Sequence, residues 1–508
     1  MLLIHPPVAK PCEPPAGIAR LAGALRGAGF SCTLLDANLE GQLFLLASRP
    51  KATDTWSRRA DRAAAANLAE LRGPELYSAP DRYRRAVADL NRVLEMAGRT
   101  HNLSLSMANY QDPAYSPLKS EDLLRAAADF RENIFFPYFA GRLHELFGDS
   151  RHATIGISLN YLSQALPSFA LAGYLRHSFP GIRLVMGGGL VTSWLRNPDW
   201  SDPFAGLIDL LVAGPGEDEL LRLAGGANLP RKAPPDYSGL PLTEYLAPGL
   251  ILPYAASSGC YWHRCLFCPE KAEGNPYRPL PPDQVLDDLA GLIRAATPVL
   301  LHFLDNAISP ALLAALAARP PDVPWYGFAR IDHNLADPAF CRDLRRAGCV
   351  MLKLGLESGS EKVLAAMDKG IDLSLVERAL TALHAAGIRT YVYLLFGTPA
   401  ESPTEARETL AFTVRHARAI SWLNLAVFNM PLGSPEADML QLDRFSEGDL
   451  SLYTDFVHPR GWDRKAIRRF LDQEFKRQPA IAAILRRDPP LFTSNHAPFF
   501  CGTASVTE

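Results

Sequence analysis

The chain has 508 residues and a formal net charge of −2 at pH 7, which suggests two or three domains and argues against a broad nucleic-acid-binding face. No apolar run reaches the roughly 18 residues of a membrane span, and the opening MLLIHPP lacks the basic start of an export signal, so we expect a cytoplasmic protein without a membrane span. The eight cysteines are unevenly spaced, a pattern that indicates metal or redox chemistry rather than a disulfide framework.

Alternating strand and helix patterns predict a first parallel α/β domain over residues 1–225. The apolar runs LLIHPP, FSCTLLDAN, ATIGISLN, IRLVMGGG and DLLVAGPG read as strands with helical periodicity between them. Such alternation predicts a doubly wound, Rossmann-like sheet with helices on both faces. An Ala-, Arg- and Leu-rich stretch at 46–150 predicts a helical insertion, for which a solvated lobe and a substrate or cofactor lid are both compatible.

A Pro- and Gly-rich linker at 226–250 separates this domain from a second one at 251–438. Six further strand candidates follow, in the runs ILPYAAS, VLLHFLDN, WYGFAR, VMLKLGLES, TYVYLLFG and WLNLAVFN. Six strand and helix units predict a partial, TIM-like (β/α)6 barrel with its active site at the carboxyl ends of the strands. Residues 439–508 should form a small, mostly helical C-terminal region.

Three cysteines follow the first strand of the second domain as C-x4-C-x2-C, at Cys260, Cys265 and Cys268. A structural zinc site needs a fourth ligand, which His263 could supply. Inert buried cysteines are expected on a strand or helix face rather than in a glycine-preceded loop. An iron–sulfur cluster held by three thiolates would keep one iron open for a substrate or cofactor.

This loop resembles the cluster loop of the radical S-adenosylmethionine (radical SAM) superfamily, with Phe267 as the aromatic residue before the last cysteine and one residue more between the first two cysteines. The segments LGLESGSEKVLAAMDKG and YLLFGTPAES resemble the fourth- and fifth-strand segments of these enzymes. The resemblance implies a [4Fe-4S] cluster held by the three cysteines, SAM bound at the open iron, and a 5'-deoxyadenosyl radical. The SAM-binding residues it implies are Phe267, Asp305, Arg330, Glu357, Phe396 and Gly397.

Particular roles follow from the resemblance. Glu357 would accept hydrogen bonds from the ribose hydroxyls or the amino group of SAM, and Gly397 with Phe396 would let the backbone approach the adenine. Asp305 and Arg330 are expected to end the second and third strands, where a cation can pair with the SAM carboxylate.

The first domain resembles the cobalamin-binding domain of cobalamin-dependent radical SAM enzymes, through HPP, DANLEG, ISLNYLSQ, GGGLVTS and AGPGEDEL at the ends of its strands. The cobalamin-binding residues this implies are Pro6, Asp36, Asn38, Ser158, Tyr161, Gly187, Gly188, Gly189, Gly214 and Glu217. Many cobalamin proteins place a cobalt-ligating histidine in a D-x-H-x-x-G loop, and DANLEG has Asn38 instead. We therefore expect no histidine ligand from this loop, which favours the four-coordinate cobalt(I) chemistry of methyl transfer. A domain of this shape that has lost the cofactor is the alternative.

The combined resemblance implies methylation of an unactivated carbon through methylcobalamin. Cyclisation, rearrangement or oxidation without methyl transfer is one alternative, and a zinc-bound nucleotide-binding or regulatory module is another. A small-molecule or peptide substrate and an external electron donor such as flavodoxin or ferredoxin are the expected partners, with no nucleic acid. The sequence does not identify the substrate.

Overall fold

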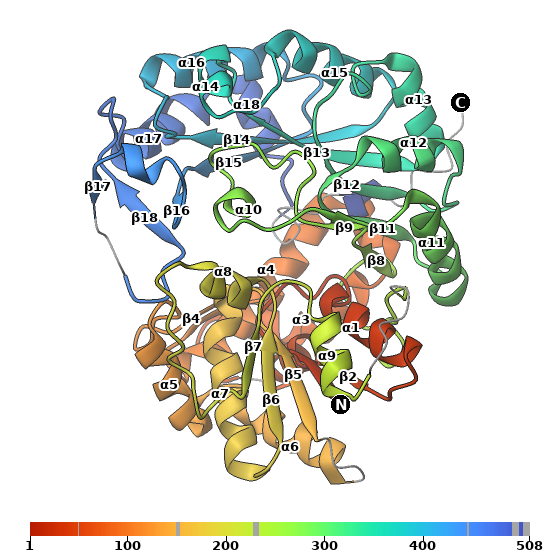
Figure 1. Ribbon diagram of the computed structural model, residues 1–508, viewed down its shortest axis with the longest axis vertical. Helices are drawn as coiled ribbons and strands as arrows, with labels where there is room; N and C mark the ends of the chain where they lie inside the picture. The colour runs from red at the N-terminus through yellow and green to blue at the C-terminus, as the bar shows by residue number, and fades with distance from the viewer. Residues whose placement is uncertain (49, 149–152, 227–232, 444–446, 490–496, 501–508) are drawn as a thin grey trace. The chain divides into compact units, whose positions relative to one another are not determined.

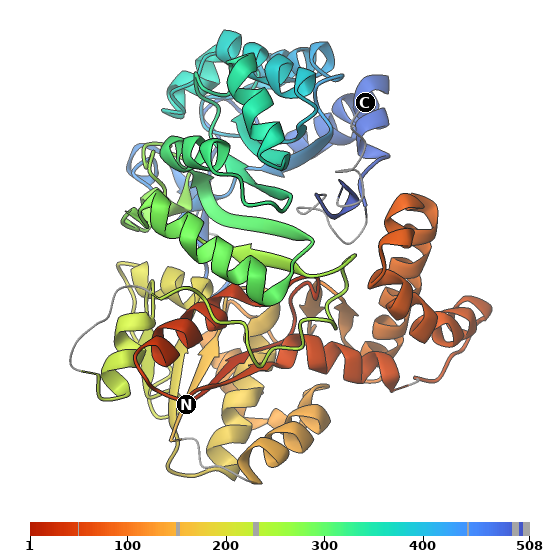
Figure 2. The same cartoon turned by 90° about the vertical axis from the view of Figure 1, so that its right-hand side faces the viewer.

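The computed structural model describes residues 1–48, 50–148, 153–226, 233–443, 447–489 and 497–500. The chain divides into two units, Met1–Ile251 with Ser446–Leu452, and Leu252–Phe445 with Tyr453–Glu508. Each unit contains one parallel β-sheet (Figure 1, Figure 2). Within the described ranges, no helix has both the length and the apolar character needed to cross a membrane.

The sheet of the first unit has five parallel strands in the order β2-β1-β5-β6-β7. These are β1 (Leu2–His5), β2 (Thr33–Asp36), β5 (Thr154–Ser158), β6 (Arg183–Gly187) and β7 (Leu210–Val212). The helices between them are α1 (Ala16–Gly27), α2 (Ala37–Ala47), α7 (Leu162–Ser178), α8 (Gly189–Arg196) and α9 (Glu217–Leu223). The predicted Rossmann-like class is confirmed, and the strand order reverses between β1 and β5, where ligands of such sheets bind.

The predicted insertion lies between β2 and β5 and is helical apart from one hairpin. It comprises α3 (Thr55–Leu71), η1 (Pro74–Ser78), α4 (Pro80–Arg99), β3 (Ser104–Ser106), β4 (Asn109–Gln111), α5 (Ser120–Ala128), η2 (Phe130–Glu132) and α6 (Phe136–Gly148). Arg92 is buried on α4, where it bonds Asp54, the N-cap of α3, at 2.8 Å and lies over the Trp56 ring at 4.7 Å. This charge pair ties the start of α3 to α4.

The second unit contains six parallel strands in the order β15-β14-β13-β12-β11-β8, which confirms the predicted partial barrel. The strands are β8 (Ile251–Tyr254), β11 (Leu300–Ile308), β12 (Trp325–Ala329), β13 (Cys349–Glu357), β14 (Arg389–Phe396) and β15 (Trp422–Val427). The helices that alternate with them are α11 (Pro282–Ala296), α12 (Pro310–Ala318), α13 (Pro338–Arg346), α14 (Glu361–Ala366), α15 (Leu373–Ala385) and α16 (Pro403–Arg415).

One strand runs further than its sequence predicts. A register shift between Phe303 and Ile308 lets β11 continue to Ile308, so Asp305 lies inside the strand rather than at its end. Arg330 follows the last residue of β12 directly, as expected.

The remaining elements of the second unit are short. Near the cysteines lie β9 (Ser257–Ser258), β10 (Arg278–Pro279) and α10 (Pro269–Ala272). Beyond β15 lie β16 (Met430–Pro431), η3 (Ala437–Met439), β17 (Leu442–Asp443), β18 (Tyr453–Phe456), α17 (Arg464–Phe470), the π-helical turn η4 (Leu471–Phe475), α18 (Pro479–Leu485) and η5 (Ala497–Phe500). The predicted helical tail thus also contributes β17 and β18 to a small antiparallel sheet.

A buried carboxyl group joins the C-terminal region to the loop after β14. Glu401 has no exposed surface and accepts hydrogen bonds from the Gly397 backbone N–H at 2.5 Å and from Trp462 Nε1 at 2.9 Å. Beside it, His458 Nε2 lies 3.0 Å from the Thr398 carbonyl oxygen. Burial raises the pKa of Glu401 to about 7. The loop after β14 is therefore held by a carboxyl group that resists ionisation.

Because the folded-state pKa of Glu401 exceeds that of an unfolded glutamate, its protonated form stabilises the fold below about pH 4.5, and this contribution is lost as the pH rises to about 7. Glu401→Gln is neutral at every pH, so between about pH 5 and about pH 8 the variant should become more stable than the native protein. The gain in the free energy of unfolding is at most about 3 kcal/mol, and the melting temperature should rise with it. Thermal unfolding in a pH series measures this difference.

The matched control is Glu408→Gln on α16, where the side chain is exposed. Its melting temperature should follow that of the native protein at each pH. A Glu401→Gln difference that stays constant over the same range would contradict the assignment.

Candidate active site

The three cysteines lie in a loop, Gly259–Cys268, that leaves β9 and ends at α10. All three are free thiols and half-buried. Gly259 begins the loop with φ +73°, and a Cβ there would lie 2.5 Å from the Pro276 carbonyl oxygen, so only glycine fits. We call this segment the cysteine loop.

Asp305 fastens the base of the cysteine loop. Its buried carboxylate accepts hydrogen bonds from the Ala256 backbone N–H at 3.0 Å and the Ser257 hydroxyl at 2.5 Å. Burial raises the pKa of Asp305. The structure thus engages both carboxylate oxygens of this predicted SAM-binding residue in positioning the loop.

The cysteine loop packs on the turn that follows α14, residues 367–370. The Leu266 N–H donates to the Met367 carbonyl oxygen at 3.0 Å, and Arg264 pairs with Asp368 at 2.9 Å. Trp262 Nε1 also lies 3.4 Å from the Asp368 carbonyl oxygen. The four residues between the first two cysteines therefore form a docked segment, not a free turn.

The extra residue between the first two cysteines is accommodated by a turn at His263. This residue is exposed and has a left-handed backbone with φ +47°, while Trp262 before it is half-buried. In the described part of the chain, no three His, Cys, Asp or Glu side chains gather as ligands of a single metal ion.

Cations lie beside the thiols. Burial raises the pKa of Cys265, and the positive charges of Lys369 and Arg330 oppose that rise. Burial likewise raises the pKa of Cys268 to about 11, against hydrogen bonds from the backbone of Glu270 and Lys271. Free, half-buried thiols with cationic and N–H neighbours have the donor chemistry that a cluster bound through thiolates requires.

Glu357 ends β13 and pairs with Lys369 at 2.8 Å, with both side chains largely buried. The Lys369 ammonium also lies 5.3 Å from the centre of the Phe267 ring. A Cβ at Gly355 would lie 2.4 Å from the Glu357 carboxylate, so glycine leaves room for this pair. Lys369 was missed from the sequence, although it sits in the segment LGLESGSEKVLAAMDKG that suggested Glu357.

Phe396 and Gly397 lie at the end of β14. The Phe396 side chain is fully buried against Phe470 and Phe475, with ring centres 6.1 Å and 5.3 Å away, so only its backbone can face a ligand. A Cβ at Gly397 would lie 2.4 Å from Ile467. The predicted residues Phe267, Arg330 and Glu357 gather near Cys265 and Lys369, whereas these two lie at the neighbouring strand end.

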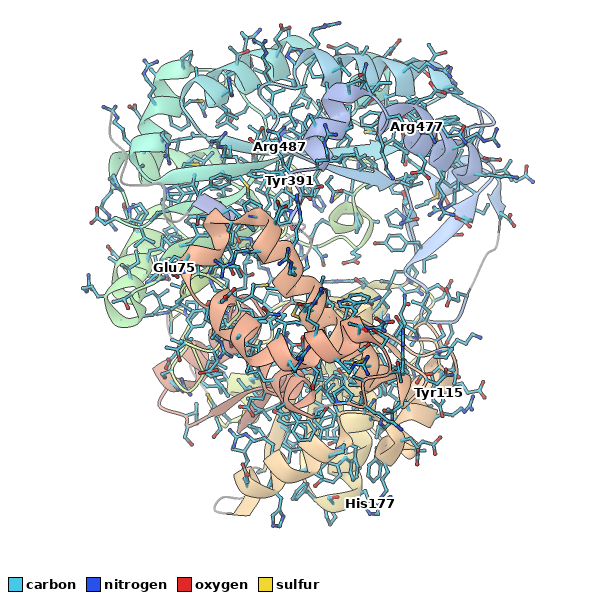
Figure 3. All side chains as sticks on the ribbon, turned by 180° about the vertical axis from the view of Figure 1, so that it is seen from behind. Glu75, Tyr115, His177, Tyr391, Arg477 and Arg487 are labelled. Atoms are coloured by element: carbon cyan, nitrogen blue, oxygen red, sulfur yellow. The ribbon has the colours of Figure 1, made fainter. Side chains whose placement is uncertain are left out.

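A polar cluster on neighbouring strands was not predicted. His302 on β11 stacks on Tyr326 of β12 with ring centres 4.3 Å apart, and His302 Nε2 lies 3.1 Å from Lys353 Nζ on β13. Nearby on β14, Tyr391, labelled in Figure 3, packs on Tyr393 at 4.8 Å. The sequence feature that could have indicated this cluster is the presence of a histidine and a lysine inside the apolar runs LLHFL and MLKLGL.

In the first unit, four predicted residues point into the fold: Pro6, Asp36, Asn38 and Ser158 are buried. Asn38 Oδ1 accepts hydrogen bonds from the Ala9 N–H at 2.7 Å and from Gln42 at 2.8 Å. Asp36 caps α2 and accepts from the Tyr245 hydroxyl at 2.7 Å, while burial raises its pKa to about 6. These polar atoms form hydrogen bonds inside the fold and so stabilise the strand ends.

The other predicted residues lie at the carboxyl ends of β5, β6 and β7, namely Tyr161, Gly187, Gly188, Gly189, Gly214 and Glu217. Tyr161 is 57 % exposed, and Gly189 is also exposed. Gly188 has φ +110°, and a Cβ there would lie 2.4 Å from the Leu159 carbonyl oxygen. Glu217 pairs with Arg20 at 2.5 Å. At the ends of β5 to β7, Tyr161 and Gly189 are thus exposed, and the glycines contribute no side chains.

Gln164 organises the same edge and was absent from the predicted binding set. Its Oε1 accepts the backbone N–H groups of Asn160 and Tyr161 at 3.0 and 3.1 Å, and its Nε2 donates to the Pro6 carbonyl oxygen at 2.6 Å. One side chain therefore joins the ends of β1 and β5.

Comparison with protein families matches residues 255–413 to the Radical SAM superfamily. Over 186 residues the chain is 24 % identical to the "Uncharacterized methyltransferase PH0819" of Pyrococcus horikoshii, a match that covers 35 % of this chain and 40 % of that protein. The match thus spans about two fifths of the relative's length.

Two solved structures share the fold. The radical S-adenosylmethionine methyltransferase TsrM from Kitasatospora setae, with a tryptophan substrate and a SAM analogue bound, has a TM-score of 0.57 and 16 % identity, over 96 % of this chain and 89 % of that one. The cobalamin-dependent S-adenosylmethionine radical enzyme OxsB, with aqua-cobalamin and S-adenosylmethionine bound, has a TM-score of 0.53 and 16 % identity, over 65 % and 60 %.

The family match begins just before the cysteine loop and extends through α14 and β14 into α16. A [4Fe-4S] cluster and SAM are the cofactors of that superfamily. Residues 255–413, which contain the cysteine loop and most of the partial parallel barrel, therefore match the radical SAM superfamily.

Proposed function

We propose that this protein is a cobalamin-dependent radical SAM methyltransferase that methylates an unactivated carbon. The observation that carries the proposal is the combination, in one chain, of the cysteine loop with a parallel β2-β1-β5-β6-β7 sheet that has glycines and an exposed Tyr161 at its carboxyl ends. The fold shared with TsrM over 96 % of the chain supports it.

Cys260, Cys265 and Cys268 would hold the cluster, with Lys369 and Arg330 favouring the thiolate form of Cys265. Glu357 and its partner Lys369 would orient the polar groups of SAM, and the backbone at Gly397 would approach the adenine. When bound, the cluster supplies an electron to SAM, and cobalamin supplies a methyl carrier. An external one-electron donor would reduce the cluster.

In the first unit, Tyr161, Gly187–Gly189 and Gly214 would border the cobalamin. Planar ligands of such sheets lie across the carboxyl edge, and glycines there let the ring approach the backbone. Asn38 fills the sequence position that the histidine has in a D-x-H-x-x-G loop, and its Oδ1 accepts hydrogen bonds from Ala9 and Gln42. Asn38, Pro6, Asp36 and Ser158 would stabilise the carboxyl ends of the strands as buried residues. Glu217 would hold α9 against α1 through its ion pair with Arg20.

Replacing any one of Cys260, Cys265 and Cys268 by alanine should abolish SAM cleavage and lower the iron content of anaerobically purified protein from about four per chain. Iron analysis and chromatography of SAM products measure the two effects. Cys32→Ala, which removes a half-buried thiol of the first unit, is the control and should keep both. Full cleavage activity in one of the three variants would remove that cysteine from the ligand set, and one zinc without iron would support the regulatory alternative.

Protein purified anaerobically with hydroxocobalamin should retain about one cobalamin per chain by its visible spectrum. With methyl-labelled SAM, mass spectrometry should recover the label in the cobalamin fraction. Gly189→Leu should lower cobalamin retention at least about tenfold, because Gly189 is exposed and a bulky side chain would project from the carboxyl end of the sheet, where the first contact of a built Cβ is at 3.7 Å.

Gly141→Leu on α6 is the matched control, since Gly141 is also exposed and has no atom within 4 Å of a built Cβ. It should retain cobalamin fully. Native protein that holds cluster and SAM but no cobalamin would instead favour cyclisation, rearrangement or oxidation without methyl transfer.

A further inference from the structure

The Arg330 guanidinium is held on two sides beside the cysteine loop. It lies over the Trp262 ring at 3.7 Å from the ring centre, and its Nη2 donates to the Lys369 carbonyl oxygen. The same turn accepts a hydrogen bond from the Leu266 N–H, which brings the adjacent Cys265 to the turn that Arg330 also contacts. Stacking and hydrogen bonding together restrict the plane of the guanidinium more than either contact would alone.

Trp262 belongs to the segment that is longer than usual in this family. The left-handed turn at His263 leaves Trp262 packed on the protein, with its indole N–H directed at Asp368. A Cβ at Gly370 would lie 2.2 Å from the Trp262 ring, so the turn after α14 provides the space for the indole. The longer loop thus positions the Trp262 ring on which Arg330 stacks.

Arg330 differs from its cationic neighbours in how its charge is balanced. Lys369 pairs with Glu357 at 2.8 Å and Arg264 pairs with Asp368 at 2.9 Å. Among the described residues, Arg330 forms no ion pair with a carboxylate. Its half-buried positive charge is therefore directed at the thiols instead of being neutralised by a neighbour.

We propose that Arg330, oriented by Trp262, raises the reduction potential of the cluster by placing an unpaired positive charge beside Cys265. The inference rests on the proposed role of the three cysteines as ligands. Positive charge and hydrogen-bond donors near ligand sulfurs stabilise the added electron of a reduced cluster. One electron passes from the external donor to the cluster, and no bond to Arg330 forms or breaks.

The test is a potentiometric titration of the reconstituted cluster with dithionite, followed by electron paramagnetic resonance without SAM, so that turnover plays no part. Arg330→Gln should make reduction about tenfold less favourable, a shift of about 59 mV to lower potential for one electron. Arg330→Lys keeps the charge and should restore most of the native potential. Trp262→Leu keeps the arginine but removes its stacking surface, and should give an intermediate shift.

Arg319→Gln is the matched control. Arg319, at the end of α12, is paired with Asp287 at 2.8 Å and is half-exposed, so its loss should change the equilibrium less than about twofold. Equal potentials in native protein and Arg330→Gln, or an equal shift in Arg319→Gln, would overturn the proposal. Loss of the cluster in both Arg330→Gln and Arg330→Lys would do so too, because it would show a purely structural role.

Failure of the proposed function gives a different result. If native protein binds no cluster, or if the cysteine variants keep it, the ligand assignment fails. If native protein binds a cluster that the cysteine variants lose, and Arg330→Gln titrates like native protein, only the inference about Arg330 fails. Cluster loss in Arg330→Gln with a native potential in Arg330→Lys supports the role of the charge.

Discussion

Three thiols in one short loop repel one another once they ionise, so the loop must be held from outside. Asp305 holds its base through Ala256 and Ser257, and the turn after α14 holds its middle through Met367 and Asp368. These contacts come from β11 and from the segment after β13, which are distant from the loop in sequence. The chemistry of the site depends on this external support, because the loop has little regular structure of its own.

The same turn also brings charge to the thiols. Lys369 lies between Glu357 and Phe267, and its carbonyl oxygen accepts from Arg330. A single residue therefore connects a strand end, the aromatic residue of the cysteine loop and the cation beside Cys265. In a half-buried setting such charges interact more strongly than they would in water, and small displacements matter correspondingly more.

The loop after β14 is also held by a side chain from outside regular structure, here a buried carboxyl group. Glu401 is buried between the Gly397 N–H and the Trp462 indole, so the C-terminal region determines how this strand end is held. In the first unit, Gln164 joins the ends of β1 and β5, while Asn38 fixes the segment after β1. In each case a buried polar side chain satisfies backbone groups that would otherwise be costly to bury.

Local pattern alone determined most of the architecture. Strand runs, helical periodicity and cysteine spacing are local properties, and they predicted both parallel sheets, the insertion and the cysteine loop. They could not determine which polar side chains face a ligand. Asp305 and Asn38 read as loop residues but hydrogen-bond within the fold, and the extension of β11 depends on its pairing with β12. Lys369, Trp262 and Arg330 come into contact only through tertiary packing. Their contact depends on which strands are neighbours in the sheet, and sequence spacing alone does not predict it.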